Sequence, residues 1–149
     1  MKKFKASIAV MASLISVSAT IMSAPAAQAG VGDCTGSLIA RKVANASGTA
    51  VGELVVYYNA STGNNCARFN HIGPSYGLTR ETSVFIERCP TNNPASNCFL
   101  TGGPSDHDAS SYAYYAGPVQ VYSPNKCVRA YGYIMWGGAR RGAEMITGC

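Results

Sequence analysis

The stretch Val51 to Tyr58, Val-Gly-Glu-Leu-Val-Val-Tyr-Tyr, indicates the fold class of this chain. It is rich in β-branched and aromatic residues, which favour extended strands. Turn-forming residues bound it on both sides, at Ala46-Ser47-Gly48 and at residues 59–65. Because Cys66 to Ile72 follows directly, the sequence predicts a β-hairpin with these two segments as its arms.

Similar short segments recur along the rest of the chain. We predict strands at Ser83–Glu87 and Cys127–Ile134, and weaker ones at Leu38–Val43 and Ala143–Thr147. Tyr112–Tyr115 and Val119–Tyr122 flank Gly117-Pro118, which we expect to bend or interrupt one longer strand. Short strands separated by frequent turns predict an all-β fold, a small antiparallel β-sandwich or barrel.

The first thirty residues have the features of a secretory signal peptide. A cationic segment, Met1 to Lys5, precedes 17 uncharged residues that contain four serines. Ala27-Gln28-Ala29 offers the small side chains that a signal peptidase accepts, so we expect cleavage after Ala29. The uncharged stretch is short for a membrane anchor, the alternative interpretation. We therefore predict a signal peptide over residues 1–29 and one secreted domain over residues 30–149, with no transmembrane segment after cleavage.

Cleavage removes most of the positive charge of the precursor. The 149 residues have a formal net charge of +5. Three of the 12 basic residues lie in the leader and all 7 acidic residues lie beyond it, so the net charge falls to about +2. Only Arg140-Arg141 hints at a basic patch, and Glu144 is close to it in sequence. We therefore do not expect nucleic acid as a partner.

All six cysteines lie beyond the leader, at Cys34, Cys66, Cys89, Cys98, Cys127 and Cys149. An even number of cysteines in a small exported domain indicates a disulfide framework. Six cysteines allow 15 pairings, and spacing alone does not choose among them. No Cys-x-x-Cys pair occurs and the two histidines are not spaced as zinc ligands, so we predict neither a metal site nor a cofactor.

The most specific motif is Tyr-Tyr-Ala-Gly-Pro-Val at Tyr114 to Val119. It occurs with a cysteine near the expected mature N-terminus, the pair Val56-Tyr57, the turn Gly63-Asn64-Asn65-Cys66, and cysteines at positions 127 and 149. With these features the chain resembles spore-associated protein A and related small secreted proteins of filamentous actinomycetes. The resemblance spans nearly the whole expected mature domain and implies an exported protein of the cell or spore surface without assigned catalytic residues.

The resemblance also implies a disulfide pairing. If the cysteines shared with the family bond as neighbours, the pairs are Cys34–Cys66 and Cys127–Cys149. Cys89 and Cys98 depart from the family pattern, and they are left to close a local loop rich in proline and asparagine.

Asp106-His107-Asp108 is the one concentrated cluster of ionisable residues. It suggests a divalent-cation site, or His107 as a general base oriented by a carboxylate. However, the cluster follows the turn formers Gly102-Gly103-Pro104-Ser105, and no calcium-loop spacing follows it. Gly-x-Ser-x-Gly is also absent. We therefore predict a solvated surface loop here and no catalytic residue.

The nine tyrosines all lie beyond the leader. Side chains alternate along a strand, so Tyr114 and Tyr115 are expected on opposite faces, and some tyrosines must face outward. Outward rings beside an arginine can form a face that binds sugars or peptides. The predicted binding residues are Tyr57, Arg68, Tyr114, Tyr115 and Arg129. The alternative is that the rings form ordinary cross-strand pairs.

Two segments of the chain are similar to each other. Val56-Tyr57 leads through a turn to Asn64-Asn65-Cys66-Ala67-Arg68, and Val121-Tyr122 leads through a shorter turn to Asn125-Lys126-Cys127-Val128-Arg129. Both predict a hairpin whose return arm opens at the cysteine, with an arginine two residues further on the same face. The similarity indicates either a duplicated half-domain or a coincidence between two turn-rich segments.

Three classes of function are compatible with these patterns. The first, which we favour, is a secreted non-catalytic protein of the cell or spore surface, with cell-wall or spore-surface material as its expected partner. The second is a secreted binding module or a protease-inhibitor-like protein that presents the loop Cys89 to Cys98. The third is a small secreted hydrolase with an unrecognised site.

Overall fold

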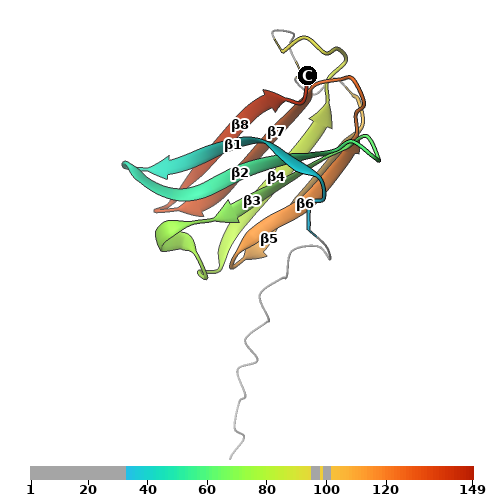
Figure 1. Cartoon of the computed structure of the whole chain (residues 1–149). Coiled ribbons are helices and arrows are strands. Elements are labelled where there is room, and N and C mark those ends of the chain that lie inside the picture. Colours follow the sequence, from blue (N-terminus) through green and yellow to red (C-terminus); the bar gives the residue numbers. More distant parts are fainter. Residues whose placement is uncertain (1–32, 95–97, 99–101) are drawn as a thin grey trace, which may run out of the picture.

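The computed structural model describes residues 33–94, 98 and 102–149, which form two antiparallel sheets packed face to face (Figure 1). The expected signal peptide, residues 1–29, lies outside the described residues. The described part of the chain contains eight strands and one 3-10 turn, η1 (Gly73–Ser75), with no α-helix. The predicted all-β, disulfide-stabilised sandwich is therefore confirmed.

Each sheet has four strands. Sheet A has the order β1-β2-β3-β6 and is formed by β1 (Ser37–Ala46), β2 (Thr49–Asn59), β3 (Asn64–His71) and β6 (Tyr115–Tyr122). Sheet B has the order β5-β4-β7-β8 and is formed by β4 (Arg80–Arg88), β5 (Ser105–Tyr112), β7 (Val128–Trp136) and β8 (Ala139–Thr147).

The core lies between the two sheets because alternate residues of their central strands are apolar. Sheet A contributes Leu54 and Val56, and sheet B contributes Val84 and Ile86, all without exposed surface. Phe69 of β3 is the largest fully buried side chain. Glycines make room for it, because a Cβ atom at Gly52 or Gly132 would lie only 2.4 Å from its ring.

The expected hairpin is present, with β2 paired to β3 in antiparallel register from Gly52 opposite His71 to Asn59 opposite Asn64. The prediction of one longer strand over residues 112–122 that bends or breaks at Gly117-Pro118 is wrong. The chain turns at Ala113-Tyr114, so β5 and β6 belong to different sheets, and Gly117-Pro118 lies inside β6. A proline is tolerated there because β6 is an edge strand, which needs hydrogen bonds on one side only.

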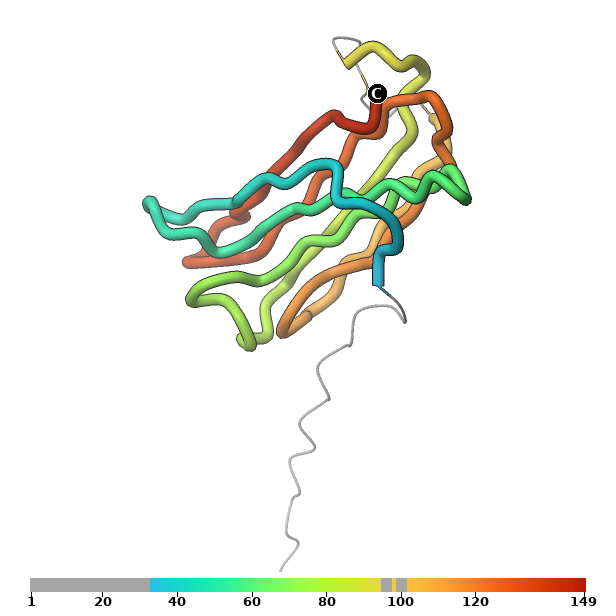
Figure 2. The backbone as a smooth tube through the Cα atoms, in the orientation of Figure 1, coloured from blue at the N-terminus to red at the C-terminus, as the bar shows by residue number. Residues whose placement is uncertain are grey.

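The second predicted hairpin is also wrong. β6 pairs with β3 in sheet A, whereas β7 pairs with β4 and β8 in sheet B. Residues 123–127 therefore carry the chain from one sheet to the other, as the tube in Figure 2 shows. Turn formers alone do not distinguish a hairpin turn from such a crossing.

The structure forms the disulfides Cys34–Cys66, Cys89–Cys98 and Cys127–Cys149, the three pairs that the resemblance implies. The first fixes the segment before β1 to β3, and the third fixes the C-terminus to the start of β7. Among the described residues, no helix is long and apolar enough to cross a membrane.

Candidate functional site

Asp106, His107 and Asp108 do not lie in a loop, contrary to the prediction, but in strand β5. Alternation along the strand turns the two carboxylates to one side and His107 to the other. Asp108 Oδ2 accepts the backbone N–H of Gly117 at 2.6 Å, and Asp106 Oδ2 accepts that of Gln120 at 2.9 Å. Asp108 also accepts the hydroxyl of Tyr112. The carboxylates thus bind the free edge of β6. The ring of His107 is exposed, and within the described structure no carboxylate is hydrogen-bonded to it.

His71, at the end of β3, is buried and its Nε2 lies 2.7 Å from Thr82 Oγ1. The Thr82 hydroxyl donates to the carbonyl oxygen of Arg80, so the histidine ring is the donor in this pair. Burial lowers the pKa of His71 below its ordinary value because a charged ring would lose its hydration. His71 is therefore a neutral, structural histidine that joins β3 to β4.

Residues 33–94, 98 and 102–149 contain no group of three or more histidine, cysteine, aspartate or glutamate side chains arranged to hold a metal ion.

Arg68 lies on the outward face of sheet A, at the centre of the outer surface of β3. It stands opposite Val55 of β2 and faces the bulge of β6 on its other side. Its guanidinium carbon lies 4.6 Å from the centroid of the Tyr115 ring, so the cation stacks on the aromatic face. Only 22 % of the Arg68 side chain is exposed, and Nε has no partner among the described residues.

The disulfide Cys34–Cys66 holds Asp33, the other partner of Arg68, close to the guanidinium. Cys66 precedes Arg68 by two residues on the same face of β3, so the bond holds the N-terminal segment over this face. Asp33 is thereby placed with Oδ1 2.7 Å from Arg68 Nη1. The Asp33 side chain is 80 % exposed, and a solvated ion pair of this kind contributes only about 0–1 kcal/mol.

Two adjoining grooves meet at Arg68. The larger, of about 620 Å³, runs past Asn70 and Tyr115 to Tyr76 and Tyr114, and residues His71 to Gly73 complete its lining. The smaller, of about 370 Å³, is lined by Asp33, Cys34, Tyr57 and Arg68. We call the surface formed by Tyr57, Arg68, Asn70, Tyr76, Tyr114 and Tyr115 the Arg68 face.

The far end of the larger groove carries a pair of exposed aromatic rings. The centroids of Tyr76 and Tyr114 lie 5.2 Å apart in an edge-to-face arrangement. Turns position both rings, because Tyr76 follows η1 and Tyr114 lies between β5 and β6. Backbone hydrogen bonds from His71 to Tyr114 and from Gly77 to Ala113 tie these turns together. The rings therefore offer apolar area and hydroxyl groups from a fixed position.

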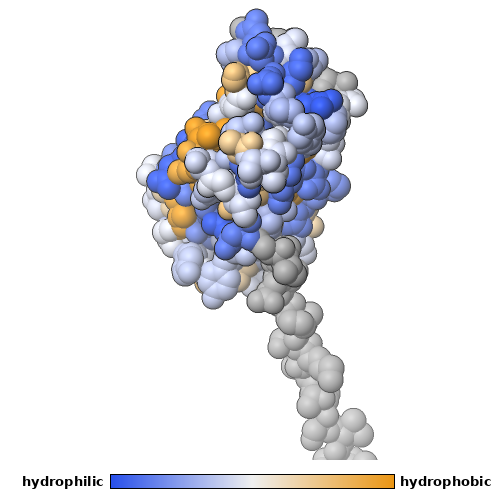
Figure 3. All heavy atoms as spheres, turned by 45° about the vertical axis from the view of Figure 1, so that its right-hand side comes forward, coloured by the Kyte–Doolittle hydropathy of each residue, from blue (hydrophilic) through white to orange (hydrophobic). Residues whose placement is uncertain are grey.

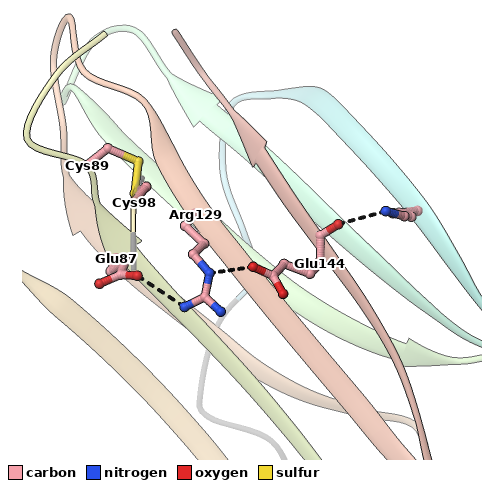
Figure 4. Close-up of polar contacts among 6 residues, drawn as sticks. Glu87, Cys89, Cys98, Arg129 and Glu144 are labelled. Atoms are coloured by element: carbon pink, nitrogen blue, oxygen red, sulfur yellow. Dashed lines mark hydrogen bonds and ion pairs between the residues drawn. A yellow bond between two sulfur atoms is a disulfide. The ribbon is translucent and has the colours of Figure 1, made fainter. Parts of the chain in front are cut away.

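Arg129, the fifth predicted binding residue, lies on the other sheet. It stands between two glutamates (Figure 4), with Nε 2.6 Å from Glu144 Oε1 and Nη1 3.1 Å from Glu87 Oε1. Burial opposes the charge of Arg129, but the two carboxylates outweigh it and raise its pKa further. The structure thus gathers Tyr57, Arg68, Tyr114 and Tyr115 on one surface and places Arg129 in an ion-pair network of sheet B. The expectation that Tyr114 and Tyr115 lie on opposite faces is wrong, because Tyr114 lies in the turn before β6, where strand alternation does not apply, and both rings line the larger groove.

Sequence reasoning did not find Asp33, Asn70 or Tyr76. Asn70 shares the outward face with Arg68 because the two residues are two apart on one strand, so alternation was a usable signal. Tyr76 is an aromatic residue among the turn formers Gly73, Pro74, Ser75 and Gly77, a pattern typical of an exposed ring. No sequence signal connects Asp33 to Arg68, because their contact depends on the disulfide.

No protein-family model, curated protein or solved structure matches this chain. The function is therefore inferred from the chemistry of its surface. On the side of the molecule in Figure 3, strongly hydrophobic side chains form small groups between hydrophilic ones.

Proposed function

We propose that this chain is a secreted, non-catalytic protein that associates with the surface of a cell or spore, and that it binds there through the Arg68 face. The observation that carries the proposal is the meeting of two grooves at one partly exposed guanidinium, with tyrosines on both sides. Aromatic rings and a planar cation bind by stacking and hydrogen bonding.

The location is supported by the predicted leader and by the cysteines. Within the described structure no cysteine is free, and three disulfides in a small domain are typical of exported proteins. The resemblance to spore-associated protein A supports association with a surface.

The geometry of the polar residues supports a binding role over catalysis. General acid–base chemistry needs a titratable group within reach of its partner. Among the described residues, neither histidine ring hydrogen-bonds a carboxylate: that of His71 bonds Thr82, and the aspartates beside His107 bond β6. The Arg68 face contains groups that bind and orient a ligand, and among the described residues Asp33 is the one carboxylate that lines either groove.

Sedimentation with isolated cell-wall and spore material tests the proposal. The wild-type chain should co-sediment, and Arg68→Ala or Tyr115→Ala should weaken the affinity about fivefold or more, because the loss of an anchor residue of an interface costs over about 1 kcal/mol. Arg140→Ala is the matched control, since Arg140 also stacks 4.6 Å over a tyrosine, Tyr133, but on sheet B.

Equal binding by Arg68→Ala and wild type would remove the Arg68 face from the proposal. Turnover of a substrate from a broad hydrolase panel, abolished by His107→Ala, would overturn the non-catalytic role.

A further inference from the structure

Arg68 forms its ion pair with Asp33, which borders the Arg68 face and is exposed to solvent. Asp33 contacts Arg68 through one carboxylate oxygen at 2.7 Å, and its side chain is largely in water. A guanidinium is a planar donor that suits carboxylates, and stacking on Tyr115 holds its plane in place. The site therefore already binds a carboxylate. Replacing the exposed Asp33 carboxylate by that of a ligand should cost little free energy.

The geometry of the two grooves indicates a ligand that extends on both sides of the carboxylate it places at Arg68. Arg68 lines both the larger groove and the smaller one, so a chain bound at Arg68 has room to extend in two directions. Tyr57 lies on one side, whereas Tyr115, Tyr114 and Tyr76 lie on the other. Sugar rings pack on tyrosine rings, and the amide of Asn70 offers both a donor and an acceptor for hydroxyl groups.

We propose that the ligand of the Arg68 face is an acidic polysaccharide whose sugar carboxylate replaces Asp33 on Arg68, while neighbouring sugar rings pack against the tyrosines. This inference rests on the proposed function and deepens it by naming the ligand class. Asp33 acts as an internal competitor, which occupies the guanidinium until the ligand carboxylate displaces it.

Calorimetric titration with an oligogalacturonate and with its methyl ester tests this proposal. The two probes differ only at the carboxyl group, which is a charged carboxylate in the acid and a neutral methyl ester in the other. The chain is expressed with its own leader and purified in oxidised form, so that Cys34–Cys66 is intact. Wild type should bind the acid at least about tenfold more tightly than the ester, as expected when a charge-assisted bond is lost.

Variants then distinguish the effect of the Asp33 carboxylate from that of the sugar carboxylate. Arg68→Ala should abolish the preference for the acid. Asp33→Asn, which removes the competitor, should bind the acid about two- to fivefold more tightly, in line with the small free energy of an exposed ion pair. Its affinity for the ester should stay within about twofold of wild type. Arg140→Ala is the control and should bind both probes as wild type does.

The following results would overturn the proposal. Equal affinity for acid and ester, or weaker binding of the acid by Asp33→Asn, would show that Arg68 does not take the sugar carboxylate. Equal affinity for polyglutamate would assign the face to acidic peptides, and preference for a phosphate-linked wall polymer would assign it to phosphate. If wild type sediments with wall material but binds neither galacturonate probe, only the ligand class fails. If wild type binds neither wall material nor the galacturonate probes, the proposed function fails as well.

Discussion

Arg68 and Arg129 occupy the same position in two similar segments, each two residues after a disulfide-bonded cysteine, yet the two arginines have different surroundings. Arg129 lies between Glu87 and Glu144 on sheet B, with 13 % of its side chain exposed. Arg68 has one solvated carboxylate, an aromatic ring and two grooves beside it. The same local sequence thus gives a structural ion pair where carboxylates from neighbouring strands flank the arginine, and an arginine that lines two surface grooves where they do not.

Arg129→Ala should have the largest effect on stability. Glu87 is 2 % exposed, and removing the cation leaves a buried carboxylate without this partner. Breaking such a pair typically costs about 3–5 kcal/mol. We expect a loss of this size in the free energy of unfolding, measured by urea denaturation. Glu87→Gln in the Arg129→Ala background should recover part of it. A loss below about 1 kcal/mol would contradict a structural role for the network.

Removal of the disulfide beside Arg68 should have the next largest effect. Cys34 and Cys66 are 32 residues apart, and closing a loop of this length stabilises a fold by about 3.7 kcal/mol through the lost entropy of the unfolded chain. The double variant Cys34→Ser, Cys66→Ser should lose about that much stability in thermal and urea unfolding. It should also lose the contact between Asp33 and Arg68, so its affinity for the acidic probe should resemble that of Asp33→Asn. Wild-type stability in this variant would contradict the expectation.

Lowering the pH should have a smaller effect on the free energy of unfolding, through the buried ring of His71. This histidine lies on β3, the strand of Arg68, whereas β7, the strand of Arg129, contains no histidine. The folded-state pKa of His71 lies below the unfolded value of 6.5. The neutral ring therefore contributes its full stability above about pH 6.5, and this contribution is lost as the pH falls toward the folded-state pKa. The loss reaches up to about 1.4 kcal/mol per pH unit.

Urea unfolding of wild type at pH 7.5, 6.5 and 5.5, compared with His71→Gln, measures this slope. The variant should show a shallower fall between pH 6.5 and 5.5. His107→Gln is the matched control, because His107 is exposed, and its slope should equal that of wild type. An unchanged slope in His71→Gln would show that burial of this ring does not govern the response to acid.

Arg68→Ala should have the smallest effect on stability. An exposed ion pair and one stacked cation each contribute about 1 kcal/mol or less. We expect the free energy of unfolding to fall by about 1 kcal/mol while surface binding is lost. A loss as large as that of Arg129→Ala would contradict the expectation that Arg68 contributes less to stability than Arg129.

The sequence predicted the parts of the fold that local patterns determine. The β2–β3 hairpin follows from Val51–Tyr58, its turn and the return arm, because apolar residues and turn formers specify it together. The edge strand β5 was missed because Asp106, Ser110 and Ser111 resemble a loop in composition. Those residues form a strand through pairing with β4 and side-chain bonds to β6, contacts that no local pattern contains.

The same limit applies to the candidate site. Alternation correctly placed Arg68 on the same face of β3 as Cys66, but it wrongly set Tyr114 and Tyr115 on opposite faces, because Tyr114 lies in a turn. It also selected Arg129, because the pattern does not say which sheet a strand joins. That choice depends on residues 123–127, whose turn formers suit a hairpin and a crossing alike. Glu87 and Glu144 approach Arg129 only after β4 and β8 have paired with β7 on its two sides.

The aspartates of β5 also affect how copies of this protein meet. An uncovered strand edge is a template on which a second molecule can add its own strand, the first step towards fibres. In β6 the amides of Gly117 and Gln120 are already taken by Asp108 and Asp106. The strand that carries Tyr115 is therefore closed to strand addition at these positions. Two copies of this protein can therefore lie side by side at this edge without pairing through these two amides.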